Sequence, residues 1–308
     1  MKNLILVLFF FSALVSAQKK EFKAENLSIT SLIDGILIVP ESSTTMPLAI
    51  IIGGSGPVDR NGNQQMLENN SIKFLAEGLY ENGIATFRYD KRIVKQMKMR
   101  TIDESKIRFG DFIGDAVAIL EYFKNKKQFS KIFIIGHSQG SLVGMVAAQK
   151  GADGFISLAG AGQAIDAVIV DQLLKQAPGL ADNARSSFDD LREYGTASDF
   201  NPGLASIFRN DIQPFIRSWM AFDPKVEIAK LTMPVLIVNG TKDLQVQISE
   251  AEILHAAKPD ATYKIIENMN HIFKQVEGND LENSKTYNQY NLPVMPELIE
   301  VVVDFIKK

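Results

Sequence analysis

One serine in this sequence is flanked by glycines in a pattern that suits nucleophilic chemistry. Ser138 is the central residue of GHSQG, residues 136–140, which fits the G-x-S-x-G nucleophile elbow. The run 132–135 before it predicts a strand buried on both faces, and the apolar positions after it predict a helix. Gly136 and Gly140 remove side chains that would clash in so sharp a turn. The pattern predicts an exposed serine Oγ; the alternative is an ordinary glycine-rich turn.

An aspartate and a histidine each follow a predicted strand later in the chain. Asp243 comes after the apolar run 233–238, and His271 comes after the run 261–266. Because the carboxyl ends of parallel strands meet at one edge of a sheet, both residues are expected near Ser138. A serine hydroxyl becomes a good nucleophile when an imidazole accepts its proton and a carboxylate orients that imidazole. The order Ser, Asp, His is that of the α/β-hydrolases.

The other two histidines are poor candidates for the general base. His137 is adjacent to Ser138 and cannot turn back to its Oγ in the elbow geometry, and His255 lies in an amphipathic helical stretch, where a surface position is expected. His271 is therefore the predicted base. A metal centre is not indicated, because the sequence has no H-E-x-x-H motif, no cysteine and no EF-hand loop.

A glycine-rich loop, residues 53–62, follows the predicted buried strand 47–52. A dinucleotide-binding fingerprint is excluded there, because the third glycine is missing and Pro57 interrupts the turn. In α/β-hydrolases, however, the loop after the third strand supplies one of the two N–H groups of the oxyanion hole. We expect the backbone N–H of Ser55 to be that donor. The N–H of Gln139, at a helix start, is the expected second donor.

Three charged residues near this loop have two interpretations. Asp59 and Arg60 either contact substrate or brace the loop against neighbouring segments. Asp90 follows the predicted strand 84–89, and we interpret it as a turn or capping residue among basic neighbours rather than a catalytic acid.

Strands and helices alternate along most of the chain, which predicts an α/β fold with a mostly parallel central sheet, flanking helices and right-handed crossovers. Residues 22–40 predict an antiparallel opening hairpin. Residues 163–224 are helical without a strand, and we expect a helical cap inserted into a core of residues 18–162 and 225–308. One cap helix has an apolar face made of Phe208, Ile212, Phe215, Ile216, Trp219 and Met220. Of these, Phe215, Trp219 and Met220 are candidate substrate contacts, the alternative being that they form the cap's own core.

Composition and the first residues limit the partners and the location. The chain has 308 residues, a formal net charge of −3 and no basic run, so nucleic-acid binding is not indicated. Lys2, the apolar run 4–14 and the small residues 15–17 are typical of a secretory signal peptide over residues 1–17. This predicts a periplasmic or secreted protein without stable membrane insertion after cleavage, the alternative being an uncleaved anchor. Without cysteine, neither a lipid-modified cysteine nor a disulfide is possible.

Five stretches together resemble one protein family. They are GGSGPVDRNGN (53–63), FRYDKR (87–92), GHSQGS (136–141), NGTKD (239–243) and NMNHIFK (268–274). The chain resembles α/β-hydrolases of the EstD-like bacterial esterase group, which is related to the serine aminopeptidase-like hydrolases. The resemblance implies a carboxylic ester hydrolase without a cofactor, with Ser138, Asp243 and His271 as the triad and Ser55 and Gln139 as the oxyanion hole.

Three function classes follow from these observations. The first is a serine esterase that acts on short- to medium-chain acyl esters through an acyl-enzyme. The second is a peptidase or amidase with the same triad, and the third is a non-catalytic binding protein on this fold. A complete triad favours catalysis over binding, and no charged cluster marks the predicted cap as a site for a peptide terminus.

Overall fold

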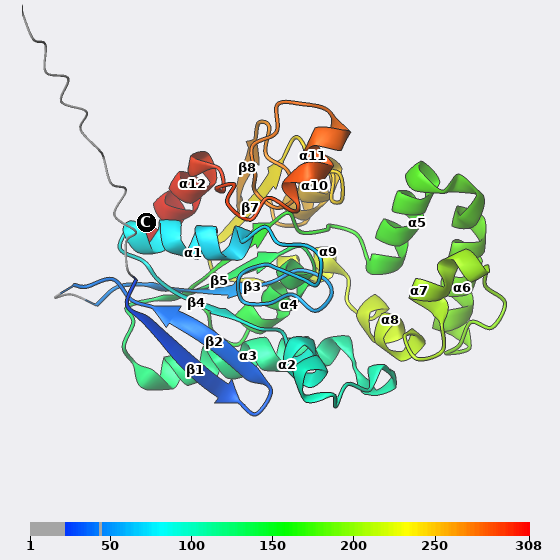
Figure 1. The fold of residues 1–308 in the computed structure, drawn as a ribbon, viewed down its shortest axis with the longest axis horizontal. Helices are drawn as coiled ribbons and strands as arrows, with labels where there is room; N and C mark the ends of the chain where they lie inside the picture. Colours follow the sequence, from blue (N-terminus) through cyan, green and yellow to red (C-terminus); the bar gives the residue numbers. More distant parts are fainter. Residues whose placement is uncertain (1–21, 43–44) are drawn as a thin grey trace, which may run out of the picture.

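An eight-stranded, mostly parallel sheet forms the centre of the molecule (Figure 1). The computed structural model describes residues 22–42 and 45–308, so the predicted signal peptide lies outside the described residues. The strand order is β1-β2-β4-β3-β5-β6-β7-β8, and only the β1–β2 and β2–β4 pairs are antiparallel. The strands are β1 (Ala24–Thr30), β2 (Ile33–Ile38), β3 (Leu48–Ile52), β4 (Ala85–Tyr89), β5 (Ile132–His137), β6 (Gly154–Leu158), β7 (Val235–Gly240) and β8 (Thr262–Ile266). The predicted α/β sheet with an antiparallel opening hairpin is confirmed.

Helices cover both faces of this sheet. The flanking helices are α1 (Ser71–Glu81), α2 (Arg92–Met99), α3 (Phe109–Lys126), α4 (Gln139–Ala148), α10 (Ile248–Ala257), α11 (Asp280–Thr286) and α12 (Pro296–Lys307). Leu48 and Ile50 of β3 pack on the face covered by α3 and α4, whereas Ala49 and Ile51 pack on the face covered by α1 and α12. Burial on both faces explains why the central strands are continuous apolar runs.

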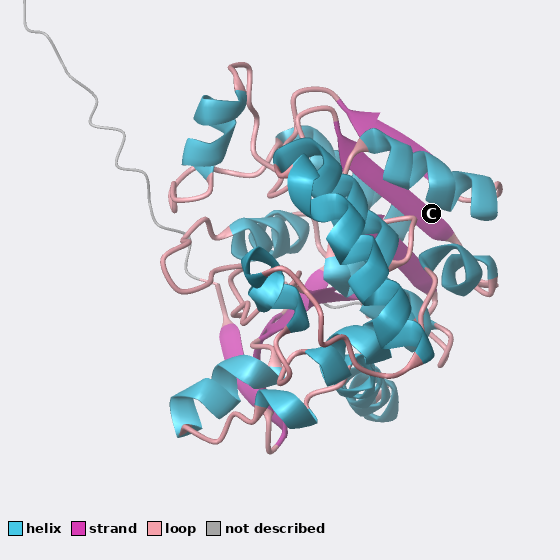
Figure 2. Cartoon of the chain, turned by 90° about the vertical axis from the view of Figure 1, so that its right-hand side faces the viewer, coloured by secondary structure: helices cyan, strands magenta, loops and turns pink. Residues whose placement is uncertain are grey.

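The segment between β6 and β7 is helical. It contains α5 (Ile165–Gln176), α6 (Ala181–Glu193), α7 (Ala205–Phe208), α8 (Gln213–Met220) and α9 (Pro224–Ala229), with short 3₁₀ turns at Pro178–Leu180 and Pro202–Leu204. A further 3₁₀ turn, Glu104–Lys106, lies between α2 and α3. We call α5–α8 the cap helices; they stand to one side of the sheet in Figure 1, and Figure 2 looks from that side. They share a core of their own, the cap cluster, made of Ala184, Phe188, Leu191, Ala197, Leu204, Phe208 and Ile216. The helix α9 instead packs through Ile228 into the main core.

Two helices differ from their predicted extent. The spacing from Gln64 predicts a helix, but α1 begins only at Ser71, because the Asn63 side chain accepts the N–H groups of Asn69 and Asn70 and holds a loop. The apolar face from Phe208 to Met220 is split between α7 and α8. Pro214, in the first turn of α8, has no N–H to donate to a preceding turn, so a single continuous helix is disfavoured. Among the residues described here, no helix is both long enough and apolar enough to span a bilayer.

Candidate active site

Ser138 occupies the sharp turn between β5 and α4. Its backbone has φ 54° and ψ −122°, a region that a residue with a side chain rarely adopts. A Cβ atom at Gly140 would lie within 2.6 Å of the Gly53 carbonyl oxygen, and one at Gly136 would lie 2.5 Å from the Cα of Ser141. Only glycines allow α4 to pass this close to β3 and β5. The side chain of Ser138 is partly exposed at the edge of the sheet.

His271 and Asp243 form a buried pair at the same edge. Nδ1 of His271 lies 2.8 Å from Oδ2 of Asp243, and since a carboxylate only accepts, Nδ1 carries the hydrogen. The other oxygen, Oδ1, accepts the N–H groups of Gln245 and Val246, both at 2.8 Å. Asp243 is thus fixed by its own loop after β7. The ring nitrogen Nε2 of His271 is left as a proton acceptor, as a general base requires.

The glycine-rich loop after β3 lies against Ser138. A Cβ atom on Gly54 would be 3.3 Å from the Cβ of Ser138, which places the following residue, Ser55, beside Ser138. The Ser55 N–H has no hydrogen-bond acceptor within residues 22–42 and 45–308, and the Gln139 N–H, first in α4, has no intrahelical one. Both amides are available to bind a negatively charged oxygen.

Two cavities meet beside Ser138. The smaller one, about 280 Å³, is lined by Ser138 itself, and the larger one, about 840 Å³, extends between α2, α3 and α8. The cavities share Ser55, Gln139 and Trp219. The larger cavity is lined mainly by apolar and aromatic side chains, among them Ile93, Met97, Ile102, Ile107, Phe112, Ile212, Phe215 and Trp219. Such a lining suits an apolar acyl or alcohol group.

The sequence is similar to that of a known esterase. The chain is similar to Esterase EstD of Thermotoga maritima, with 26% identity over 269 residues. The match covers 84% of this chain and 62% of the relative, so the chain spans less than two thirds of the relative's length. No family model matches the sequence.

Several solved structures are similar to this chain and establish its fold. Est1E from Butyrivibrio proteoclasticus superposes with a TM-score of 0.58 at 20% identity, covering 92% of this chain and 99% of that one. An acylaminoacyl peptidase from Pyrococcus horikoshii has a TM-score of 0.55 at 14% identity, covering 94% and 42%. The chain has the α/β-hydrolase fold. The resemblance to EstD-like esterases is likewise confirmed.

Within this α/β-hydrolase fold, His137 has a position that the sequence did not indicate. The residue is buried, and its Nε2 lies 2.9 Å from the backbone carbonyl oxygen of His271. Because a carbonyl only accepts, Nε2 carries the hydrogen. Burial, and then the charge of His271, lowers the pKa of His137 to about 3, so its ring stays neutral. His137 therefore holds the loop of His271 without competing for its proton. His255 is half-buried in α10 and stacks on Tyr263.

The charged residues of the glycine-rich loop brace it. Arg60 donates to Asp90 through Nε at 3.0 Å and through Nη2 at 2.8 Å. Asp59 accepts the backbone N–H groups of Asn61 and Asn63 at 2.8 and 2.9 Å. The structure therefore supports the interpretation that Asp59 and Arg60 brace the loop. Asp90 is the residue that binds the Arg60 side chain.

Two of the three predicted substrate contacts line a cavity, and the third does not. Phe215 and Trp219 line the larger cavity, and Trp219 also stacks on Phe109 with ring centroids 5.3 Å apart. Met220 lines neither cavity and packs against the cap cluster instead. The helix α8 turns different sides toward the cavity and the cap, a split that the sequence alone does not reveal.

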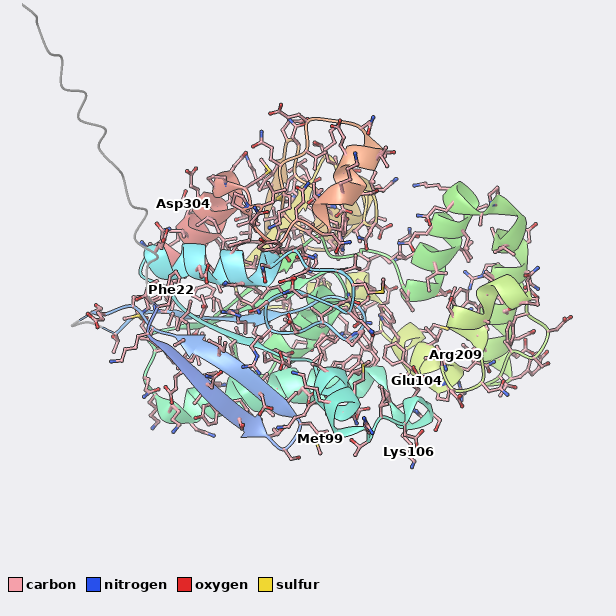
Figure 3. The ribbon with its side chains drawn as sticks, in the orientation of Figure 1. Phe22, Met99, Glu104, Lys106, Arg209 and Asp304 are labelled. Carbon is pink, nitrogen blue, oxygen red and sulfur yellow. The ribbon has the colours of Figure 1, made fainter. Side chains whose placement is uncertain are left out.

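Ion pairs neutralise the charged rim of the larger cavity. Glu104 is paired with Arg209 of the cap segment at 2.7 Å, where the cap meets the 3₁₀ turn after α2 (Figure 3). Asp103 is paired with Lys106 at 2.9 Å, and Asp211 lies 3.9 Å from Arg209. Each rim carboxylate thus has a cation from this chain as its neighbour.

Proposed function

We propose that this protein is a serine carboxylesterase that acts on short- to medium-chain acyl esters through an acyl-enzyme. Ser138 Oγ attacks the ester carbonyl carbon while His271 Nε2 accepts the hydroxyl proton. The carbon–oxygen bond to the alcohol then breaks, and the alcohol leaves with that proton. A water molecule attacks the acyl-serine with the same help from His271, releasing the carboxylic acid and restoring Ser138.

The observation that carries this proposal is the Asp243–His271 hydrogen bond of 2.8 Å at the sheet edge where Ser138 occupies its strained turn. If GHSQG were only an ordinary glycine-rich turn, it would not explain the buried imidazole–carboxylate pair beside it. The proposed triad is supported further by the N–H groups of Ser55 and Gln139, which have no backbone acceptor in the described part of the chain and suit the developing oxyanion. The similarity to a protein named as an esterase points to the same reaction.

The shape and lining of the cavities support an ester with a small or medium apolar acyl group. A volume of about 840 Å³ lined by Phe112, Phe215 and Trp219 holds an apolar chain, and the volume of about 280 Å³ at Ser138 holds the other part of the ester. An amine terminus of a peptide would need an unpaired carboxylate. Since Asp103 and Glu104 are already paired with cations, the rim favours neutral esters over aminoacyl substrates.

Hydrolysis of a panel of p-nitrophenyl esters, from acetate to octanoate, tests the proposal beside aminoacyl p-nitroanilides. We expect ester turnover that is abolished in Ser138→Ala, with little or no anilide cleavage. Anilide cleavage that exceeds ester cleavage would support the peptidase alternative. Absence of both activities from the folded protein would support the non-catalytic one.

We also propose a periplasmic or secreted location, supported by the charged start, apolar run and small residues within positions 1–17. Mass spectrometry of the protein exported from its host cell tests this. A mature chain that begins at Gln18 is expected, whereas a full-length chain retained in the cytoplasm would contradict the proposal.

A further inference from the structure

A buried lysine lies directly behind the loop that carries Ser55. Lys91 comes two residues after β4, and only 4% of it is exposed. Its Nζ donates two hydrogen bonds of 2.7 Å, one to the backbone carbonyl of Gly54 and one to Oε1 of Gln139. Buried lysines are rare because the ammonium is costly to remove from water. These two acceptors are therefore the features that hold it there.

Each acceptor is covalently linked to one N–H group of the proposed oxyanion hole. The carbonyl of Gly54 and the N–H of Ser55 are the two ends of one planar peptide unit. A hydrogen bond accepted by the carbonyl polarises that unit, and its N–H becomes a stronger donor. The second bond fixes the side chain of Gln139, whose N–H is the other proposed donor. One ammonium group thus contacts the peptide unit of one proposed donor and the side chain of the other.

We propose that Lys91 is a positioning residue of the oxyanion hole, which orients the Gly54–Ser55 peptide and the start of α4 so that both N–H groups converge on the oxyanion. The inference rests on the ester hydrolysis proposed above. Lys91 lines neither of the two cavities beside Ser138, so it acts through the peptide and not on the substrate. Its charge adds to the stabilisation of the tetrahedral intermediate from a buried position.

The surroundings of Lys91 make its charge sensitive to pH. From α3, the ring of Phe112 lies 4.4 Å from Nζ, and Asp115 faces the same small void as Tyr89 of β4. Asp115 is itself held by Arg92 at 2.7 Å. Burial lowers the pKa of Lys91 to about 7, although the charge of Asp115 opposes the shift. The ammonium form is thus complete only below neutral pH.

Two histidines, His137 and His271, also lie near Gly54. Their effects must be distinguished from that of Lys91 in any pH experiment. The position of a Cβ atom on Gly54 is 3.5 Å from Nδ1 of His137, whose ring contacts that of His271. His137 stays neutral down to a pH of about 3. His271 is present in the wild type and in every Lys91 variant, so their comparison isolates what Lys91 adds.

Lys91→Met keeps the length and the packing against Phe112 but removes the donor and the charge. We expect kcat for p-nitrophenyl acetate to fall about 10- to 100-fold below neutral pH, with KM changed less than about threefold, because the lost interaction forms with the transition state. The advantage of the wild type is expected to shrink as the pH rises above about 7. Lys150→Met, an exposed lysine after α4, is the matched control and should retain wild-type kcat.

The amide resonance of Ser55 gives a readout that does not depend on turnover. In ¹H–¹⁵N spectra of the wild type we expect the chemical shift of this resonance to change with a midpoint near pH 7. In Lys91→Met we expect this pH-dependent change to be absent. If Lys91→Met does not fold, Lys91→Gln, which is also uncharged, replaces it in both measurements. An inactive wild type would refute the proposed function. A wild type that hydrolyses esters while the variant keeps kcat within about twofold, or keeps the Ser55 titration, would overturn the role of Lys91 alone.

Discussion

His137 donates a hydrogen bond from Nε2 to the backbone carbonyl of His271, at 2.9 Å. The residue next to Ser138 in the chain therefore holds the loop of His271, although 134 positions separate the two histidines. The contact ties the elbow after β5 to the loop after β8. It restrains the His271 loop relative to the turn that contains Ser138.

Loss of this contact is expected to weaken catalysis without abolishing it. In His137→Phe the carbonyl of His271 loses its donor inside the protein, which costs about 1–3 kcal/mol of stability. We expect kcat to fall about tenfold because His271 is less well positioned, while KM changes little. Kinetics and urea unfolding on the same samples test this. An unchanged kcat in a destabilised variant would show that the contact is purely structural.

The three proposed catalytic residues are expected to act as one unit. Ser138→Ala, His271→Ala and Asp243→Ala should each lower kcat by several orders of magnitude, with the smallest loss for Asp243→Ala. The double variant Ser138→Ala/His271→Ala should be no worse than its worse single parent. Circular dichroism checks that each variant is folded. Losses that add up in the double variant would mean that the two residues act independently.

The wall formed by α8 is expected to set the acyl preference. Trp219→Ala removes an indole that lines both cavities, so the ratio of kcat/KM for octanoate and acetate esters should change about tenfold. Tyr194→Ala, at an exposed ring beyond α6, serves as the control and should leave the ratio unchanged. An unaltered ratio in Trp219→Ala would mean that Trp219 serves mainly to pack on Phe109.

Lys91 is also expected to change how stability depends on pH. Its pKa is about 7 in the folded protein and about 10.5 in the unfolded chain, so the unfolded chain binds more protons between these values. The free energy of unfolding should therefore rise with pH across this window, on the order of 5 kcal/mol in all. Below about pH 7 both states hold the proton, and the cost of burial is constant.

Urea unfolding of the wild type and Lys91→Met at several pH values isolates this contribution. The free energy of unfolding of the variant should exceed that of the wild type most at about pH 6, and this difference should decrease toward about pH 10. A difference between the two proteins that is independent of pH would show that Lys91 keeps an ordinary pKa.

The sheet and the three residues at its edge were predictable because their signals are local. Ser138, Asp243 and His271 each follow a short apolar run, and parallel strands bring such positions to one edge. The roles of His137 and Lys91 depend on contacts across 134 and 37 positions, which no local pattern contains. In the sequence Lys91 is only one of several basic residues after a strand.

The limits of the helices were harder to predict for a different reason. Asn63 accepts two backbone N–H groups and so delays the start of α1, although the apolar spacing continues through the loop. In α8, Trp219 lines the cavity and Met220 packs against the cap cluster, whereas Phe215 does both. An apolar face shows that a side chain is covered, but the covering element is set by the packing of the whole chain.

Trapping of the acyl-enzyme tests the central claim most directly. The protein is mixed with p-nitrophenyl acetate, quenched in acid during turnover, and analysed as an intact chain and as peptides by mass spectrometry. We predict one acetyl group per chain, located on Ser138 and absent from Ser138→Ala. Acetyl groups on another residue, or ester hydrolysis that persists in Ser138→Ala, would contradict the account.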